Sequence, residues 1–295
     1  MLRIDKGLTC GGWYDIIIVI FCNCCVVGLW RFVLSAKSRK PLVSIVTPVH
    51  NGAAFIAETV RTVCEQTYSN WEWLIVDDKS DDDTLKVIRK VRTDLKQEGL
   101  ISGDIRIIRL EKKSGAAKAR NAGIKAARGR FLAFLDADDL WEREKLARQV
   151  DFMLKKDCAF SFTGYEFADA FGQPNGKVVR VPSEISYRQA LRNTTIWTST
   201  VMLDLDKLTI DDVLMPAIAS EDTATWWNIL RKVECAHGLD EVLSYYRRSG
   251  ETLSSNKLVA ISRIWNLYRK YEKLGLIQSS ANFVGYAFNA VRRRV

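Results

Sequence analysis

The chain has 295 residues, of which 47% are apolar, so it can bury the core of one large α/β domain with extensions. Its 44 Lys and Arg residues outnumber its 35 Asp and Glu residues, and the net charge of +9 suggests an anionic partner: nucleic acid, an anionic membrane or a phosphorylated substrate. The basic residues are spread along the chain without the basic-aromatic pattern of a nucleic-acid reader, so we expect no nucleic-acid partner.

The amino-terminal segment 13–34 is strongly apolar and close to the roughly 20 residues that a membrane-spanning helix needs. Asp15, Asn23 and Arg31 interrupt it, so a helix lying in the membrane interface is an alternative. More basic residues follow the segment than precede it, which places the main domain in the cytoplasm. We therefore interpret 1–40 as an apolar anchor with a basic linker. One rival interpretation is a cleaved signal peptide. Another is that the sequence begins upstream of the true translation start, so that this segment does not belong to the native protein.

The cysteines and histidines disfavour a structural zinc site or a disulfide framework. Of the seven cysteines, none forms a Cys-x-x-Cys pair, and the only histidines are His50 and His237. This pattern fits a reduced cytoplasmic protein better.

From residue 42 to 135, β-branched and apolar runs alternate with helical patterns. Strands are predicted at 42–47, 71–76, 105–110 and 131–135, and helices at 53–66, about 81–95 and 116–127. Strands that alternate with helices predict right-handed βαβ units and a largely parallel sheet.

Three of these strands end in polar residues. The loop 48–52 follows the first strand, Asp77 and Asp78 follow the second, and an acidic turn at 136–139 follows the fourth. Because ligands bind at the carboxyl ends of parallel strands, we predict a site on this rim. The crowded carboxylates of the turn favour a bound divalent cation, and a solvated acidic turn is the alternative. No glycine-rich dinucleotide or phosphate loop is present, which disfavours dinucleotide oxidoreductases and phosphate-loop ATPases.

Beyond Trp141 the order of elements changes. Helices are predicted at 142–155, 186–192 and 223–233, strands at 159–167 and 198–204, and a hairpin turn at 171–176. Glu221 and Asp222 precede a helix, where they either stabilise its amino terminus or supply a general base that faces the first rim. Tryptophans 197, 226 and 227 form either walls for a sugar acceptor or, as is commoner for tryptophans on helices, part of the core.

Five segments match motifs that occur together in one enzyme family. They are the strand and loop 43–52, the Asp-Asp-x-Ser turn at 76–80, Ala119-Arg120-Asn121 with Gly123, the Leu-Asp-x-Asp-Asp-Leu-Trp element within 134–141, and Tyr246-Arg247 with Ser-Ser-Asn-Lys at 254–257. The chain from about residue 41 to its end thus resembles the family 2 glycosyltransferases of the GT-A fold. Within that family it is most similar to bacterial enzymes that build surface polysaccharides such as teichuronic acid.

This resemblance implies an α/β, Rossmann-like GT-A fold with a mostly parallel central sheet flanked by helices. With the apolar amino-terminal helix, it divides the chain into four parts. We expect an anchor and linker at 1–40, a half that binds the nucleotide sugar at 41–141, a half that binds the acceptor and carries the base at 142–256, and a carboxyl-terminal amphipathic helical extension at 257–295.

The resemblance also implies roles for the residues that bind the donor. Pro48 and His50 border the uracil pocket, and Asp78 hydrogen-bonds the uracil. Asp138, in an Asp-x-Asp motif with Asp136, contacts Mn²⁺ or Mg²⁺ that bridges the diphosphate. Asp136 binds the ribose or supports the metal.

Four further residues are given less specific roles by the resemblance. Arg120 and Asn121 orient the site from their helix or serve a structural ion pair. Arg247 lies near the diphosphate. Asp139 is a supporting acid or the cap of the next helix.

The function implied is an inverting transfer from a UDP-sugar to a saccharide acceptor carried on a polyprenyl diphosphate, at the cytoplasmic face of the membrane. Asp222 is the expected base, with Glu221 beside it. The tail 261–295 mixes apolar and basic residues, and it either lies on an anionic membrane or packs against the main domain or a partner chain. A sugar-nucleotide nucleotidyltransferase is disfavoured because 48–54 is not a glycine-rich basic loop. A non-catalytic scaffold is disfavoured because Asp138 and Asp222 are present.

Overall fold

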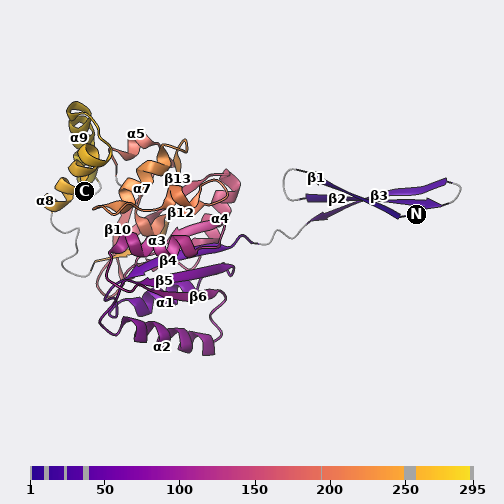
Figure 1. The fold of residues 1–295 in the computed structure, drawn as a ribbon, viewed down its shortest axis with the longest axis horizontal. Helices are drawn as coiled ribbons and strands as arrows, with labels where there is room; N and C mark the ends of the chain where they lie inside the picture. Colours follow the sequence, from indigo (N-terminus) through magenta and orange to yellow (C-terminus); the bar gives the residue numbers. More distant parts are fainter. Residues whose placement is uncertain are drawn as a thin grey trace. The chain divides into compact units, whose positions relative to one another are not determined.

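The computed structural model describes the backbone of residues 2–9, 13–22, 25–35, 40–193, 195–248 and 257–292, and the side chains of 40–193, 195–248, 259 and 261–290. The chain forms two compact units, Met1–Pro41 and Leu42–Val295 (Figure 1).

The first unit is a three-stranded antiparallel sheet of β1 (Leu2–Thr9), β2 (Trp13–Cys22) and β3 (Cys25–Ser35), in the order β1-β2-β3. The helix expected at 13–34 is therefore wrong. Isoleucine and valine dominate this segment, and β-branched residues favour strands over helices. Among the described residues, no helix has both the length and the apolar character needed to cross a bilayer.

The second unit is built on a ten-stranded mixed sheet with the order β11-β13-β9-β12-β7-β4-β5-β6, to which β10 adds beside β9 and β8 beside β13. Its strands are β4 (Val43–Val49), β5 (Trp71–Asp77), β6 (Asp104–Arg109), β7 (Phe131–Phe134), β8 (Leu140–Trp141), β9 (Phe160–Ala168), β10 (Pro174–Val179), β11 (Glu184–Ile185), β12 (Met202–Asp204) and β13 (Ala236–Arg247). Strands β7, β4, β5 and β6 are parallel, as predicted. The remainder is mixed, because β12 runs antiparallel to both β7 and β9.

Helices cover both faces of this sheet (Figure 1). They are α1 (Ile56–Cys64), α2 (Thr84–Gln97), α3 (Ala116–Ala126), α4 (Lys145–Lys156), α5 (Tyr187–Ala190), α6 (Ile210–Val213), α7 (Glu221–Leu230), α8 (Lys257–Asn266) and α9 (Leu276–Arg292). Successive strand residues point to opposite faces. Ile45 and Ile75 therefore pack in one hydrophobic cluster with residues of α1, α2 and α4, whereas Val46 and Leu74 pack in a second cluster with residues of α3 and α7.

The second half departs from its prediction in three places. The strand expected at 198–204 is a 3₁₀ turn, Thr198–Thr200, followed by the short strand β12. The twelve-residue strand β13 was not predicted. Helix α7 begins at Glu221, so the two acids lie in its first turn and not before it. The predicted hairpin turn does join β9 to β10.

The tryptophans of α7 and the carboxyl-terminal helices share one core. Trp226 and Trp227 are buried, so their interpretation as core residues is confirmed. The ring of Trp227 stacks on Tyr268, with ring centroids 5.5 Å apart. One side of the segment α8 to α9 therefore packs against the main domain. Its other side exposes large apolar residues, among them Ile277, which is 87% exposed, and Phe288, which is 67% exposed.

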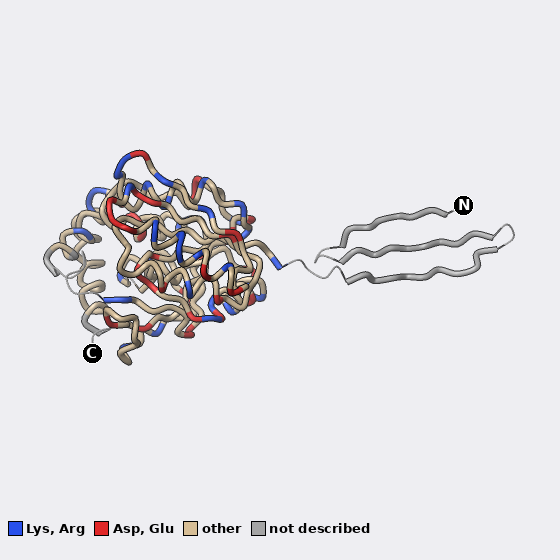
Figure 2. The backbone as a smooth tube through the Cα atoms, turned by 90° about the horizontal axis from the view of Figure 1, so that it is seen from below, with Lys and Arg blue, Asp and Glu red and all other residues tan. Residues whose placement is uncertain are grey.

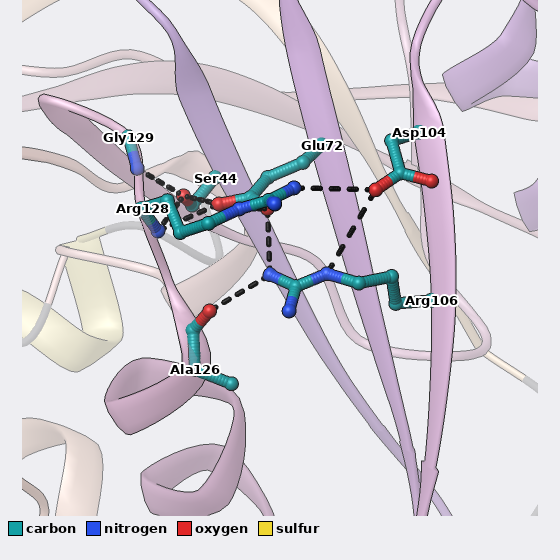
Figure 3. Close-up of polar contacts among 7 residues, drawn as sticks. All are labelled: Ser44, Glu72, Asp104, Arg106, Ala126, Arg128 and Gly129. Carbon is teal, nitrogen blue, oxygen red and sulfur yellow. Dashed lines mark hydrogen bonds and ion pairs between the residues drawn. The ribbon is translucent and has the colours of Figure 1, made fainter.

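A buried ionic cluster joins the amino-terminal ends of the parallel strands (Figure 3). Glu72 is 1% exposed and accepts hydrogen bonds from Ser44 (2.7 Å) and Arg106 (2.6 Å), and it forms an ion pair with Arg128 (2.8 Å). Burial alone would raise the pKa of Glu72, but the hydrogen bonds from Ser44, Arg128 and Arg106 outweigh it and lower the pKa. This cluster fixes the ends of β4, β5 and β6 that lie opposite the predicted site.

Charged residues of both signs are interspersed over the second unit (Figure 2). A protein that grips a nucleic-acid backbone concentrates Lys and Arg on one face or along one helix. Within the described residues, no such concentration is visible on the second unit (Figure 2).

Candidate active site

A cavity of about 350 Å³ opens where the parallel strands β7, β4 and β5 end. Six residues singled out from the sequence line it: Pro48, His50, Asp78, Arg120, Asp136 and Asp138. Five others do not line it, namely Asn121, Asp139, Glu221, Asp222 and Arg247. The predicted rim therefore exists as a hollow, and the second group lies outside its lining.

One wall of the cavity is set by His50 and Asp78. Nδ1 of His50 lies 3.0 Å from the backbone carbonyl oxygen of Asp78. A carbonyl oxygen only accepts hydrogen bonds, so this contact assigns the hydrogen to Nδ1 and leaves Nε2 of a neutral ring as an acceptor. The carboxylate of Asp78 accepts the backbone amides of Ser114 and Gly115, both at 2.7 Å. These bonds hold the start of α3 against the end of β5.

The loop after β4 is fixed by the loop after β5. The amide of Asn51, a residue in the left-handed region with φ of 53°, donates to Oγ of Ser80 at 3.0 Å. The amide of Gly52 donates to Oγ1 of Thr84 at 2.8 Å. A Cβ atom on Gly52 would lie 2.7 Å from a methyl carbon of Val49, so only glycine fits there. Contacts within the protein thus hold the two loops of this cavity wall together.

Arg120 links the cavity to helix α7. It is 7% exposed, and its guanidinium contacts Asp136 at 2.6 Å and Glu221 at 2.7 Å. Burial would lower the pKa of Arg120, but the carboxylates of Asp136, Glu221 and Asp222 outweigh burial and raise it. Burial raises the pKa of Glu221, although the charge of Arg120 opposes this shift. The predicted ion-pair role of Arg120 is therefore present, and it joins the two halves of the unit.

The acidic turn after β7 is held through its backbone. Oγ1 of Thr59, on α1, donates to the carbonyl oxygens of Ala137 (2.9 Å) and Asp139 (3.0 Å). Nε of Arg247, on β13, donates to the carbonyl oxygen of Asp138 at 2.9 Å. Elements far apart in the sequence thus fix the backbone of the turn.

Asp139 is a buried structural acid. Its carboxylate accepts hydrogen bonds from Oγ of Ser199 (2.5 Å) and the indole nitrogen of Trp197 (3.0 Å). Burial and the charges of its acidic neighbours raise its pKa well above the ordinary value. Helix α4 begins only at Lys145, so the expectation that Asp139 caps the next helix is wrong. It instead anchors the segment that leads to β12.

Arg247 lies behind the acidic turn, with its side chain buried. Besides the carbonyl of Asp138, its guanidinium contacts the carbonyl oxygen of Ala170 (3.1 Å) and the carboxylate of Glu58. It also lies over the ring of Phe55, 5.2 Å from the centroid, and Phe55 lines the cavity. The place near the diphosphate that the resemblance implied stays a prediction, and the observed contacts are with the backbone of Asp138 and the ring of Phe55. Residues 254–256 of the same motif lie outside the described residues.

Asn121 is engaged with the backbone of a single residue. Its side-chain amide donates to the carbonyl oxygen of Met215 and accepts from the amide of Met215, both at 2.8 Å. It thereby fixes the chain between α6 and α7. Any effect of Asn121 on the cavity is therefore indirect.

The two acids of α7 have different surroundings. Glu221 is paired with Arg120. Asp222 accepts hydrogen bonds from Oγ1 of Thr198 (3.0 Å) and the amide of Thr223 (2.6 Å). Ser220, directly before them, has a left-handed φ of 59°, which is uncommon outside glycine and occurs often at functional turns. Arg120 therefore forms an ion pair with the carboxylate of Glu221 but not with that of Asp222.

Trp197 lies between the acidic turn and Asp222. Its indole nitrogen donates to Asp139, and its ring packs on Tyr246 with centroids 3.9 Å apart. The neighbouring residue, Thr198, donates to Asp222. Unlike Trp226 and Trp227, Trp197 is only partly buried.

The residues of the cavity fit a hard divalent cation. Asp136 and Asp138 both line the cavity, and burial together with the charge of Asp136 raises the pKa of Asp138 to about 6. A cation between them would relieve this repulsion, and carboxylate oxygens are the ligands that Mg²⁺ and Mn²⁺ prefer. One oxygen of Asp136 is already engaged with Arg120.

Sequence reasoning missed the residues that support the turn, namely Thr59, Ser199 and Glu58. These residues belong to no recognisable motif. Their hydrogen-bond partners lie 60 to 189 residues away in the sequence, so no local pattern indicates the contacts. Only the fold brings them to the rim.

Comparison with known proteins gives a family match. The family model described as Glycosyl transferase family 2 matches residues 44–204. The chain is 41% identical over 257 residues to the putative teichuronic acid biosynthesis glycosyltransferase TuaG of Bacillus subtilis, covering 87% of this chain and 98% of that protein. It is 35% identical over 232 residues to the UDP-Glc:alpha-D-GlcNAc-diphosphoundecaprenol beta-1,3-glucosyltransferase WfgD of Escherichia coli, covering 77% and 85%.

Solved structures share the fold at low sequence identity. Residues 1–349 of Staphylococcus aureus TarS, in complex with UDP-GlcNAc, superpose with a TM-score of 0.62 at 20% identity, covering 83% of this chain and 71% of that one. The mannosyltransferase PcManGT of Pyrobaculum calidifontis, in complex with GDP-Man and Mn²⁺, gives a TM-score of 0.62 at 17% identity, covering 87% and 72%.

Proposed function

Since the chain belongs to glycosyl transferase family 2 and is a glycosyltransferase, we propose that it moves a hexose from a UDP-sugar to a hydroxyl of a lipid-linked saccharide, with inversion, in cell-surface polysaccharide biosynthesis. The observation that carries this proposal is the Arg120 bridge. It ties the acidic rim at Asp136 to the helix turn of Glu221 and Asp222. A donor in the cavity and a base on α7 would then act on one reaction centre.

Support for a UDP-sugar comes from the cavity and from the relatives. Pro48, His50 and Asp78 line the cavity, and His50 contacts the backbone of Asp78, so we assign the uracil base to these three residues. WfgD is named for UDP-Glc, and TarS was solved with UDP-GlcNAc. Asp136 and Asp138 would hold Mn²⁺ or Mg²⁺, which supplies positive charge to the leaving diphosphate when bound.

The chemical step assigned to this chain is proton removal. Asp222 accepts the proton of the acceptor hydroxyl, whose oxygen forms a bond to the anomeric carbon. The bond from that carbon to the phosphate oxygen breaks, and UDP leaves with the electron pair. The hydroxyl of Thr198 holds one oxygen of Asp222, and Arg120 keeps Glu221 out of the reaction by pairing with it.

Trp197 is the proposed floor of the acceptor subsite. Indole faces pack well against sugar rings, and this indole is fixed at its nitrogen by Asp139 and at one side by Tyr246. Its position next to Thr198 places an acceptor resting on it within the reach of the base. Rigid placement lowers the entropy cost of aligning the attacking hydroxyl.

A membrane surface is the proposed location of the acceptor. The outer side of α9 exposes Ile277, Val284 and Phe288, which lie seven and four residues apart and thus on one helix face. The preceding segment carries Arg269 and Lys270. An apolar face with basic residues nearby suits the interface of an anionic bilayer on the cytoplasmic side of the membrane. WfgD is named for an acceptor on diphosphoundecaprenol.

The proposal is tested by measuring UDP release from a panel of UDP-sugars, with Mn²⁺ or Mg²⁺, with and without a lipid-linked saccharide. Acceptor-stimulated UDP release that needs the metal is expected. A sugar-nucleotide nucleotidyltransferase would instead release diphosphate from UTP and a sugar phosphate. A non-catalytic scaffold would give neither product. In a parallel test, sedimentation with anionic vesicles should be lost in Ile277→Asp/Phe288→Asp, and Lys86→Asp, on exposed α2, is the matched control.

A further inference from the structure

Glu184, Cys235 and His237 bring three metal-binding side chains together away from the cavity. Their ligating atoms lie within 4.8 Å of one another. Sγ of Cys235 is 3.8 Å from Nε2 of His237, which is 3.7 Å from Oε1 of Glu184. In a tetrahedral zinc site, bonds of about 2.0–2.3 Å place such atoms about 3.3–3.6 Å apart. These two distances exceed the tetrahedral values by a few tenths of an ångström, and the carboxylate of Glu184 lies within 4.8 Å of Sγ of Cys235. A small rotation of the Glu184 side chain, which is 59% exposed, therefore completes the geometry.

The sheet itself enforces this arrangement. Glu184 of β11 is directly opposite His237 of β13 in the antiparallel pair, so both side chains leave the same face. Cys235, directly before β13, lies on that side as well, because its Sγ is 3.8 Å from Nε2 of His237. The next pair, Ile185 with Ala236, is buried on the other face. The three ligands are thus turned outward by the same register that buries their neighbours.

The chemistry of the set differs from that of the carboxylate rim. A thiolate, an imidazole and one carboxylate are the ligands of Zn²⁺ and similar ions, whereas Mg²⁺ and Mn²⁺ prefer oxygen alone. The carboxylates of Glu184 and Glu234 place negative charge beside Cys235, and this charge attracts a cation. The side chain of Glu184 is 59% exposed and that of His237 is 20% exposed, which leaves a ligand position open to water.

We propose that Glu184, Cys235 and His237 form a surface site for a divalent cation of the zinc class, separate from the carboxylate site. Cys235 binds as the thiolate after releasing its proton to solvent, and His237 binds through Nε2. Water takes the fourth position. The ion ties the two-residue edge strand β11 to β13, so its effect is to stabilise the fold. The site does not depend on the proposed transfer reaction.

The test uses the full chain after treatment with a chelator, titrated with Co²⁺ in excess Mg²⁺. Thiolate ligation gives a charge-transfer absorption band that oxygen ligands do not give. We expect this band to saturate at one equivalent of Co²⁺ and to disappear when Zn²⁺ is added. It should be lost in Cys235→Ser and weakened in His237→Ala, and it should persist in Cys158→Ser and Asp138→Asn. No band, or a band that survives Cys235→Ser, would overturn the proposal.

Thermal unfolding gives a second measurement that does not depend on the absorption band of Co²⁺. Zn²⁺ should raise the Tm of the chelator-treated wild type and of Cys158→Ser. It should leave the Tm of Cys235→Ser unchanged and raise that of His237→Ala by less than that of the wild type. An equal rise in the wild type and in His237→Ala would show that zinc binds elsewhere and would contradict the site.

Discussion

Replacing Arg120 by methionine should show how much this one side chain contributes to the stability of the second unit. The buried guanidinium lies 2.6 Å from Asp136 and 2.7 Å from Glu221. Methionine keeps much of the volume but leaves two carboxylates without their partner. Breaking a buried pair in this way costs about 3–5 kcal/mol. At about 2–4 °C per kcal/mol for a unit of this size, the Tm should fall by about 6–20 °C.

The assay is thermal unfolding at neutral pH, with Arg148→Met as the matched control. Arg148 pairs with Glu144 one turn away on the surface, and such pairs contribute at most about 1 kcal/mol. The double variant Arg120→Met/Glu221→Gln should recover part of the loss, because it removes one of the two unpaired charges. If Arg120→Met unfolds at the same temperature as Arg148→Met, the ion pairs of Arg120 with Asp136 and Glu221 do not stabilise the unit.

Three further predictions concern stability, the acceptor and thiol reactivity. The pKa of Glu72 is lowered in the folded state, so its contribution to stability is present above the ordinary glutamate pKa and is lost as the pH falls through the folded-state pKa. Glu72→Gln should therefore be less stable at neutral pH and lose less stability on acidification, and urea titrations with the wild-type pH dependence would contradict this. Trp197→Phe should raise the KM for the acceptor and leave UDP affinity unchanged; equal changes in both would remove Trp197 from the acceptor subsite. Burial raises the pKa of Cys64 to about 12, so iodoacetamide at mildly alkaline pH should label it only after denaturation, as mass spectrometry of its peptide can check.

The first half of the fold was predictable because its signals are local. Runs of β-branched or other apolar residues marked β4, β5 and β7, and polar residues at their ends marked the rim. Parallel strands place those ends together, so Asp78 and Asp138 were expected on one cavity that the structure contains. Here local pattern and sheet geometry agree.

The second half was less predictable because its contacts span long distances in sequence. Strand β13 alternates weakly and contains Gly238, yet it pairs with β9 along its length. Arg247 meets Asp138 across 109 residues, and no local feature distinguishes that contact from one with a diphosphate. Cys235 and His237 acquire Glu184 as a neighbour only through the register of β11.

The central claim is that Asp222 removes the acceptor proton while the rim binds the nucleotide. It is tested most directly by comparing sugar transfer and UDP binding in the wild type and in Asp222→Asn, which keeps the size of the side chain. The account predicts a loss of transfer of about 10²–10⁴-fold with UDP affinity unchanged. Transfer at the wild-type rate in Asp222→Asn would contradict it.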